Sequence, residues 1–479
     1  MKRAIIALSF ISLQSIIPNQ QQTFAQPANQ SVVQPVNQST RQPADQSPAN
    51  RSAANQSTAL NTPGPAAPLP IPNAPILTGA DQMSQYLPLL RGASVAVFAN
   101  QTSVVGKSHL VDTLLKKGIH IIKIFAPEHG FRGDADAGEH VNSQTDPKTG
   151  IPIISLYGSK LKPSADDLAD VDVMLFDIQD VGVRFYTYIS SLQKYIESAI
   201  ENNRPLIILD RPNPNGYYVD GPVLDPAYKS FVGMQPVPIV YGMTLGEYAR
   251  MLVGEQWLDA ALDGDLNTIH AINESARKID SLIQSMRKRP INIGRNDFRL
   301  IVIPCRNYTH KSRYVLPVKP SPNLSNMQSV YLYPSLCFFE GTQISLGRGT
   351  NKPFQQFGHP SFPKDLYHFI PERTPGATNP PLLDQTCYGY DLSKVNVAKE
   401  TGNRLSLKWL ILAYHNYPDK TGFFLGQGGF FNKLAGNAIL QQQLIDGKTE
   451  EEIRKSWEPA LNNFRKIRKK YLLYPDFSS

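Results

Sequence analysis

The sequence contains few cysteines and lacks the short motifs that mark several common enzyme classes. Its 479 residues include three cysteines, Cys305, Cys337 and Cys387, and no CxxC spacing. A thiolate metal site is therefore not expected, and one disulfide of unassigned pairing stays open. No glycine-rich phosphate loop follows the first expected strand, where ANQTS stands at 99–103, which argues against a dinucleotide site. No G-x-S-x-G elbow is present, which argues against an esterase or amidase of that kind.

Long apolar runs are also scarce. Residues 1–25 have the pattern of a signal peptide, in which Lys2 and Arg3 precede a mainly apolar stretch and TFA at 23–25 approximates a cleavage site. The stretch is short for a membrane span and no other candidate follows. We therefore expect export to the periplasm or the outside of the cell without stable membrane insertion, with an uncleaved anchor as the alternative. Residues 26–75, rich in Gln, Asn, Ser, Ala and Pro, are expected to form a disordered tether.

The net charge of +8 does not indicate nucleic-acid binding. Much of the basic excess lies at 465–470, on an expected helix over 450–472. We interpret this run as a solvated helix face, with weak attraction to anionic polymers as the alternative. Because no nucleic-acid module signature is present, nucleic acid is not expected as a partner.

Apolar strands alternate with helices in the first half of the folded region. Strands are expected at 94–98, 119–125, 151–156, 171–176, 206–209 and 300–303, and helices at 108–117 and 189–201. This alternation predicts an α/β domain over 76–310 with a parallel sheet covered on both faces. The composition then becomes Pro-rich and aromatic, and a smaller α+β domain is expected over 311–479.

Polar side chains begin where three of these strands end. The residues concerned are Glu128 and His129 after the second strand, Asp177, Asp180 and Arg184 after the fourth, and Asp210 and Arg211 after the fifth. Because the carboxyl ends of parallel strands share one edge of a sheet, and ligand crevices lie at that edge, we predict a site there. Loop ion pairs are the competing interpretation.

Two later segments allow both a structural and a functional interpretation. Thr244 followed by Glu247 ahead of an apolar helix is a capping box, which accounts for Glu247 without a catalytic role. Glu340 ends an apolar run, and Gly347 and Gly349 flank Arg348 in a pattern typical of a tight turn. A turn with an ion pair and a binding role both stay open for Glu340 and Arg348.

Nine short motifs occur in order along the folded part of the chain: PEHGFRG (127–133), DIQDVGVR (177–184), YTY (186–188), LDRPNP (209–214), SFVG (230–233), GMTLGE (242–247), PSPN (320–323), EGT (340–342) and GRGT (347–350). Together they resemble the exo-β-N-acetylmuramidases, exported bacterial enzymes that release terminal N-acetylmuramic acid in peptidoglycan turnover. The resemblance runs from about residue 86 to the end. It implies a Rossmann-like domain followed by a smaller C-terminal domain, with the active site in the cleft between them. The segment between Asp259 and Asp297 looks longer than the family pattern.

The resemblance also implies roles for the polar residues. Glycoside cleavage needs one carboxyl to protonate the leaving oxygen and a second as base or nucleophile. Glu128 is expected as the acid/base, with His129 orienting it or assisting proton transfer. Asp177, Asp180, Asp210 and Glu139 are candidates for the second carboxyl, with Asp177 first, and the N-acetyl group of the sugar is a further candidate nucleophile.

The substrate-binding residues follow from the same resemblance. The lactyl carboxylate of muramic acid suits a bidentate guanidinium, from Arg184, Arg211 or Arg348. Tyr186 and Tyr188 are expected either to stack on the sugar or to lie in the core. The full set is Glu139, Asp180, Arg184, Tyr186, Tyr188, Asp210, Arg211, Asn213, Glu247, Asn323, Glu340 and Arg348. No cofactor and no metal are expected, and a non-catalytic muropeptide- or amino-sugar-binding protein is the alternative function.

Overall fold

A seven-stranded sheet forms the centre of the first half of the chain. The computed structural model describes residues 74–128, 130–131, 144–259 and 299–477. The strand order is β5-β6-β4-β1-β7-β8-β9, with bounds β1 Ser94–Ala99, β4 His120–Ala126, β5 Gln144–Thr145, β6 Pro152–Ser155, β7 Val173–Asp177, β8 Leu206–Leu209 and β9 Leu300–Ile303. All pairings are parallel except that of β5 with β6 at the edge. The predicted parallel sheet is confirmed.

Successive residues of the strands point to opposite faces, and both faces are buried. In β1, Phe98 belongs to the core on one face, while Val95 and Val97 belong to the core on the other. Helices α4 (Tyr188–Glu201) and α5 (Leu245–Gly254) contribute apolar side chains to the first core, and α1 (Met83–Leu90) and α2 (Leu110–Lys116) contribute to the second. This double burial explains why the strands read as continuous apolar runs.

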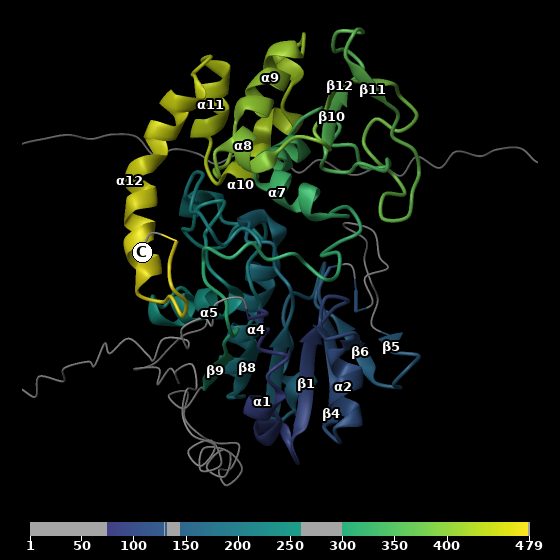
Figure 1. The fold of residues 1–479 in the computed structure, drawn as a ribbon, viewed down its shortest axis with the longest axis vertical. Helices are drawn as coiled ribbons and strands as arrows, with labels where there is room; N and C mark the ends of the chain where they lie inside the picture. Colours follow the sequence, from purple (N-terminus) through teal and green to yellow (C-terminus); the bar gives the residue numbers. More distant parts are fainter. Residues whose placement is uncertain (1–73, 129, 132–143, 260–298, 478–479) are drawn as a thin grey trace, which may run out of the picture. The chain divides into compact units, whose positions relative to one another are not determined.

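The second half contains a smaller antiparallel sheet and most of the remaining helices (Figure 1). Strands β10 (Gln356–His359), β12 (Cys387–Asp391) and β11 (Tyr367–Phe369) pair antiparallel in that order. The helices are α7 Met327–Leu336, α8 Val397–Thr401, α9 Lys408–Asn416, α10 Gly429–Ala435, α11 Ile439–Ile445 and α12 Glu450–Lys469. The expected smaller α+β domain is thus present. The first half also contains α3 (Ala165–Leu168) and the ribbon of β2 (Val104–Val105) and β3 (Ser108–His109).

The end of the chain returns to the first half along α12. Arg468, in the basic run, is 2% exposed, and its Nε and Nη2 donate to the carbonyl of Gly242 at 2.9 and 2.7 Å. Its guanidinium also pairs with Asp476 at 2.9 Å. The expectation of a uniformly solvated run was therefore wrong at this position, because Arg468 joins the C-terminal segment to the loop before α5.

Several expectations fall on residues that the structure leaves undescribed. The signal peptide, the tether up to residue 73, and all but the first residue of the 259–297 segment lie outside the described residues. Within the described ranges, no helix combines the length and the apolar character that crossing a membrane would require. The three cysteines are buried and free.

Candidate functional site

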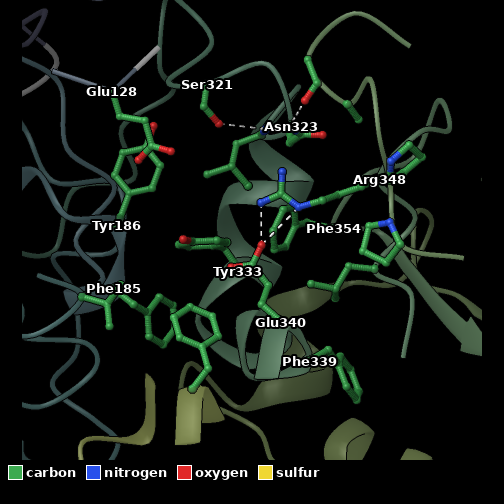
Figure 2. Close-up of a pocket in the computed structure, with 18 of the residues that line it drawn as sticks. Glu128, Phe185, Tyr186, Ser321, Asn323, Tyr333, Phe339, Glu340, Arg348 and Phe354 are labelled. Carbon is green, nitrogen blue, oxygen red and sulfur yellow. Dashed lines mark hydrogen bonds and ion pairs between the residues drawn. The ribbon is translucent and has the colours of Figure 1, made fainter. Parts of the chain in front are cut away.

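A cavity of about 1300 Å³ is lined by residues from both halves of the chain. Figure 2 shows Glu128 and Tyr186 on one side of it, and Glu340, Arg348 and Phe354 on the other. Six of the expected site residues line this cavity, namely Glu128, Tyr186, Tyr188, Asn323, Glu340 and Arg348. The two halves of the chain therefore line one pocket together, as predicted.

Glu128 reaches the cavity from the carboxyl end of β4. The strand ends at Ala126, and Pro127 then turns the chain so that Glu128 is half-buried at the cavity wall. Tyr157, from the loop after β6, forms a side-chain hydrogen bond with Glu128. Burial raises the pKa of Tyr157 to about 12, with the negative charge of Glu128 as the next cause. The phenol therefore keeps its proton at neutral pH and donates to an oxygen of the Glu128 carboxyl.

Tyr157 was missed in the sequence because it belongs to no motif that we considered. A signal was available, because Tyr157 directly follows the strand expected at 151–156. β4 and β6 pair in parallel with Ala126 opposite Ser155, and Glu128 and Tyr157 each lie two positions beyond those partners. The pairing of these two strands could not be read from the sequence.

Tyr186 and Tyr188 form the floor of the cavity near Glu128. Thr187 between them has φ +52°, in the left-handed region, and α4 begins directly afterwards. The two rings meet edge to face with centroids 4.8 Å apart, and Asn100 Nδ2 donates to the Tyr188 hydroxyl at 2.8 Å. Both tyrosines are at least nine-tenths buried, so each belongs to the core and also contributes to the cavity wall.

Glu340 and Arg348 form an ion pair on the opposite wall. Arg348 Nε and Nη2 donate to Glu340 Oε1 at 3.1 and 2.5 Å, and Arg348 Cζ lies 4.9 Å from the ring centroid of Phe354. Gly347 and Gly349 have φ +72° and +78°, conformations that glycine adopts without strain. The expected tight turn and ion pair are both present, and they place Arg348 at the cavity.

Asn323 is held in the cavity wall by the chain opposite it. Its Nδ2 donates to the carbonyl of Gly376 at 2.7 Å, and the side chain is 5% exposed. Ser321 lines the cavity beside it, and the loop containing Gly376 forms part of the same wall. These contacts leave Asn323 as a fixed polar group.

Asp177 and Arg211 do meet at the sheet edge, but as a buried pair outside the cavity lining. Arg211 Nε and Nη2 pair with Asp177 Oδ1 and Oδ2 at 2.6 and 2.8 Å, and the side chains are 2% and 0% exposed. Neither residue lines the cavity. The expected roles of Asp177 in catalysis and of Arg211 in lactyl binding therefore have no support in the geometry, because each side chain satisfies the other inside the protein.

Asp180 is also held away from the cavity. One of its oxygens accepts from Gly182 N at 2.6 Å and from the Tyr241 hydroxyl, and burial raises its pKa to about 6. Its side chain is enclosed by these neighbours and by the surrounding core, so the structure does not support the expected binding role.

Asp210 anchors the start of α5. It accepts from Thr244 Oγ1 at 2.7 Å, Gly246 N at 2.8 Å and Tyr474 Oη at 2.5 Å. Burial raises its pKa to about 6. These donors occupy both carboxylate oxygens, which explains why Asp210 serves the fold and does not line the cavity.

Arg184 binds the backbone of two distant segments. It is fully buried, Nη1 donates to the carbonyls of Pro222 and Val237 at 3.0 and 2.7 Å, and Nη2 donates to Leu434 at 2.9 Å. Burial lowers its pKa to about 9. Since Nη1 and Nη2 donate to main-chain carbonyls, Arg184 stabilises the packing of the second half on the first, and it is not among the residues that line the cavity.

Glu247 and Asn213 also form buried hydrogen bonds that stabilise the fold. The capping box of Thr244 and Glu247 is confirmed, and Glu247 Oε1 also lies 3.0 Å from His310 Nε2. Asn213 Nδ2 donates to the carbonyl of Met243 at 2.8 Å. Neither residue lines the cavity, so their expected binding roles give way to structural ones.

Two expected residues, His129 and Glu139, lie outside the described residues. In the part of the chain that the structure describes, no group of three or more His, Cys, Asp or Glu side chains could hold a metal ion.

Comparison with known proteins gives consistent matches over most of the chain. Residues 95–328 match the family model described as exo-beta-N-acetylmuramidase NamZ, N-terminal, and residues 331–474 match the C-terminal model of the same family. The peptidoglycan beta-N-acetylmuramidase NamZ of Bacillus subtilis (strain 168) is 36% identical over 414 residues, which cover 83% of this chain and 91% of that protein.

Two solved structures from Bacteroides fragilis NCTC 9343, both of DUF1343 family proteins, share the fold. The first is 42% identical, with a TM-score of 0.71 and coverage of 84% of this chain and 100% of the other. The second is 26% identical, with a TM-score of 0.66 and coverage of 83% and 99%.

Proposed function

The chain belongs to the exo-beta-N-acetylmuramidase NamZ family, and on that premise we propose that its cavity cleaves terminal N-acetylmuramic acid from peptidoglycan fragments with Glu128 as general acid. The family identifies the protein as a glycosidase. The observation that carries the residue assignment is the position of Glu128, half-buried on the wall of a large cavity and hydrogen-bonded to a phenol.

The two carboxyl groups on the described cavity wall suit different tasks. Glu128 and Glu340 are the acidic residues in that lining. Glu340 already accepts two hydrogen bonds from Arg348 through Oε1. Glu128 lies beside the phenol of Tyr157 on the other wall, and we assign it as the proton donor. It would protonate the leaving oxygen, while Glu340 or the N-acetyl oxygen of the sugar would stabilise the positive charge that develops on the ring.

Arg348 is the residue that we assign to the lactyl carboxylate of the substrate. It is the basic side chain among the described residues of the lining. Figure 2 shows its third guanidinium nitrogen pointing away from Glu340, on the side of Ser321 and Asn323. The pair with Glu340 uses Nε and Nη2, so the other edge of the guanidinium faces the space in which a second carboxylate would bind.

The assignment of Glu128 is tested with the isosteric variant Glu128→Gln. With a muramic-acid-terminated disaccharide as substrate and products identified by mass, the wild type releases free N-acetylmuramic acid, and Glu128→Gln loses at least about 100-fold in kcat. Sugar binding, measured by calorimetry, persists because the cavity keeps its shape. A variant with near wild-type turnover would remove Glu128 from the mechanism. A wild-type protein that binds the disaccharide without turnover would favour a binding function.

We also propose that the protein is exported. Lys2, Arg3 and the apolar stretch that follows support this proposal, and a cell-wall substrate is consistent with it. Mass measurement of the N-terminus of protein isolated from the cell envelope and from the medium would test it, and an intact Met1 in cytoplasmic protein would contradict it.

A further inference from the structure

The register of two neighbouring strands brings Tyr157 beside the proposed general acid. In the parallel pair of β4 and β6, Ala126 lies opposite Ser155, and Leu156 N donates to the carbonyl of Ala126 at 2.8 Å. The pairing therefore continues one step past the ends of the strands. Glu128 and Tyr157 leave the sheet at equivalent positions and both line the cavity.

The surroundings hold both partners in place. Tyr157 is half-buried and bonded to Glu128 through its hydroxyl. Tyr188 also lies close enough for the charge of Glu128 to contribute to the raised pKa of that phenol, after burial as the main cause. Tyr188 is itself fixed by Asn100, whose Oδ1 accepts from Thr102 N at 2.9 Å. The Glu128 carboxyl thus lies among phenols whose positions the sheet edge determines.

We propose that Tyr157 is a positioning residue that holds one oxygen of the Glu128 carboxyl and stabilises the carboxylate formed when Glu128 gives up its proton. This role rests on the proposed function of Glu128. In the step, the proton moves from Glu128 to the glycosidic oxygen as the bond from that oxygen to the anomeric carbon breaks, and Tyr157 keeps its own proton. The electron pair of the broken bond stays on the leaving oxygen, and water supplies the hydroxyl group that the anomeric carbon finally gains. A hydrogen bond to a charged acceptor is about twice as strong as one to a neutral acceptor, so the phenol stabilises Glu128 most once the proton has left.

The test compares Tyr157→Phe on two substrates that differ in their need for an acid. A muramic-acid-terminated disaccharide has a poor leaving group and needs protonation, whereas a 2,4-dinitrophenyl muramide has a good leaving group and needs little. We expect kcat for the disaccharide to fall about tenfold, on the scale of the difference between a charged and a neutral acceptor. The kcat for the dinitrophenyl substrate should change less than about twofold, and KM should change little for either.

The matched control is Tyr471→Phe. The Tyr471 hydroxyl donates to Glu255 Oε1 at 2.7 Å, so the variant removes the same kind of hydrogen bond at residues that are not among those lining the cavity. Its kinetics on both substrates should match the wild type. Rates are normalised to the folded fraction, measured by circular dichroism.

A double variant separates a positioning role from a merely structural one. If Tyr157 acts through Glu128, then Tyr157→Phe should add less than about twofold to the loss in Glu128→Gln, because the group that it positions is gone. Equal losses of Tyr157→Phe on both substrates, unchanged kinetics on the disaccharide, or a further tenfold loss in the double variant would each overturn the proposal. High activity of Glu128→Gln alone would instead refute the proposed function on which it rests.

Discussion

Replacing Asp177 by Asn tests whether this residue serves the fold or the reaction. In the native pair, two nitrogens of Arg211 face the two oxygens of Asp177, and both side chains are almost fully buried. The amide of Asn can accept from one of those nitrogens, but its own NH₂ group then faces the other. The substitution leaves the Arg211 charge buried without a counter-charge.

The size of the expected effect follows from this burial. Breaking a buried ion pair by removing one partner costs about 3–5 kcal/mol, a large share of the roughly 5–15 kcal/mol that stabilises a typical domain. Urea unfolding followed by circular dichroism should show that loss in the free energy of unfolding of Asp177→Asn. Arg211→Met should show a similar loss. The double variant should lose less than the sum, by up to about 3 kcal/mol, because neither charge is left unpaired.

Activity decides between the two roles. Measured under conditions in which the variant is folded, Asp177→Asn should keep kcat for a muramic-acid-terminated disaccharide within about threefold of the wild type, far from the roughly 100-fold loss expected for a catalytic acid or base. Wild-type stability together with a 100-fold loss of kcat would refute the structural role that we assign to Asp177.

Two further predictions concern Arg348 and Asp180. Arg348→Lys should raise KM for a chromogenic muramide about tenfold or more but change KM less for the matching glucosaminide, because a lysine offers a point charge and glucosamine lacks the lactyl group; equal changes on both sugars would contradict lactyl recognition. The pKa of Asp180 is about 6 in the folded state against an ordinary value of 3.8, so the folded state binds more protons between these values. The stability due to Asp180 is therefore full below about pH 4 and lost as the pH rises through about 6. In the wild type, the contribution of Asp180 lowers the free energy of unfolding by up to about 3 kcal/mol between pH 4 and pH 7. Asp180→Asn should remove this decrease, and an unchanged pH dependence of the unfolding free energy would contradict the burial argument.

The sequence by itself determined the sheet and the chemical character of its edge. Apolar runs identified β8 and β9 at their observed bounds and the other parallel strands to within about two residues, because strands buried on both faces must be apolar throughout. The Thr244 and Glu247 capping box was also readable, since its partners are three residues apart. Glu128 was also readable from the sequence, because it lies two residues beyond the end of the apolar run of β4.

Only the tertiary structure decided which polar strand ends face the cavity. The C-terminal segment covers the edge at Asp210 and Glu247, where Tyr474 donates to Asp210 across 264 positions of sequence and Leu473 N donates to Glu247 at 2.8 Å. A carboxylate that the C-terminal segment buries stabilises the fold, whereas a carboxylate that this segment leaves accessible can contact a substrate. Burial depends on what packs over a residue, and that packing is set by contacts between segments far apart in the chain.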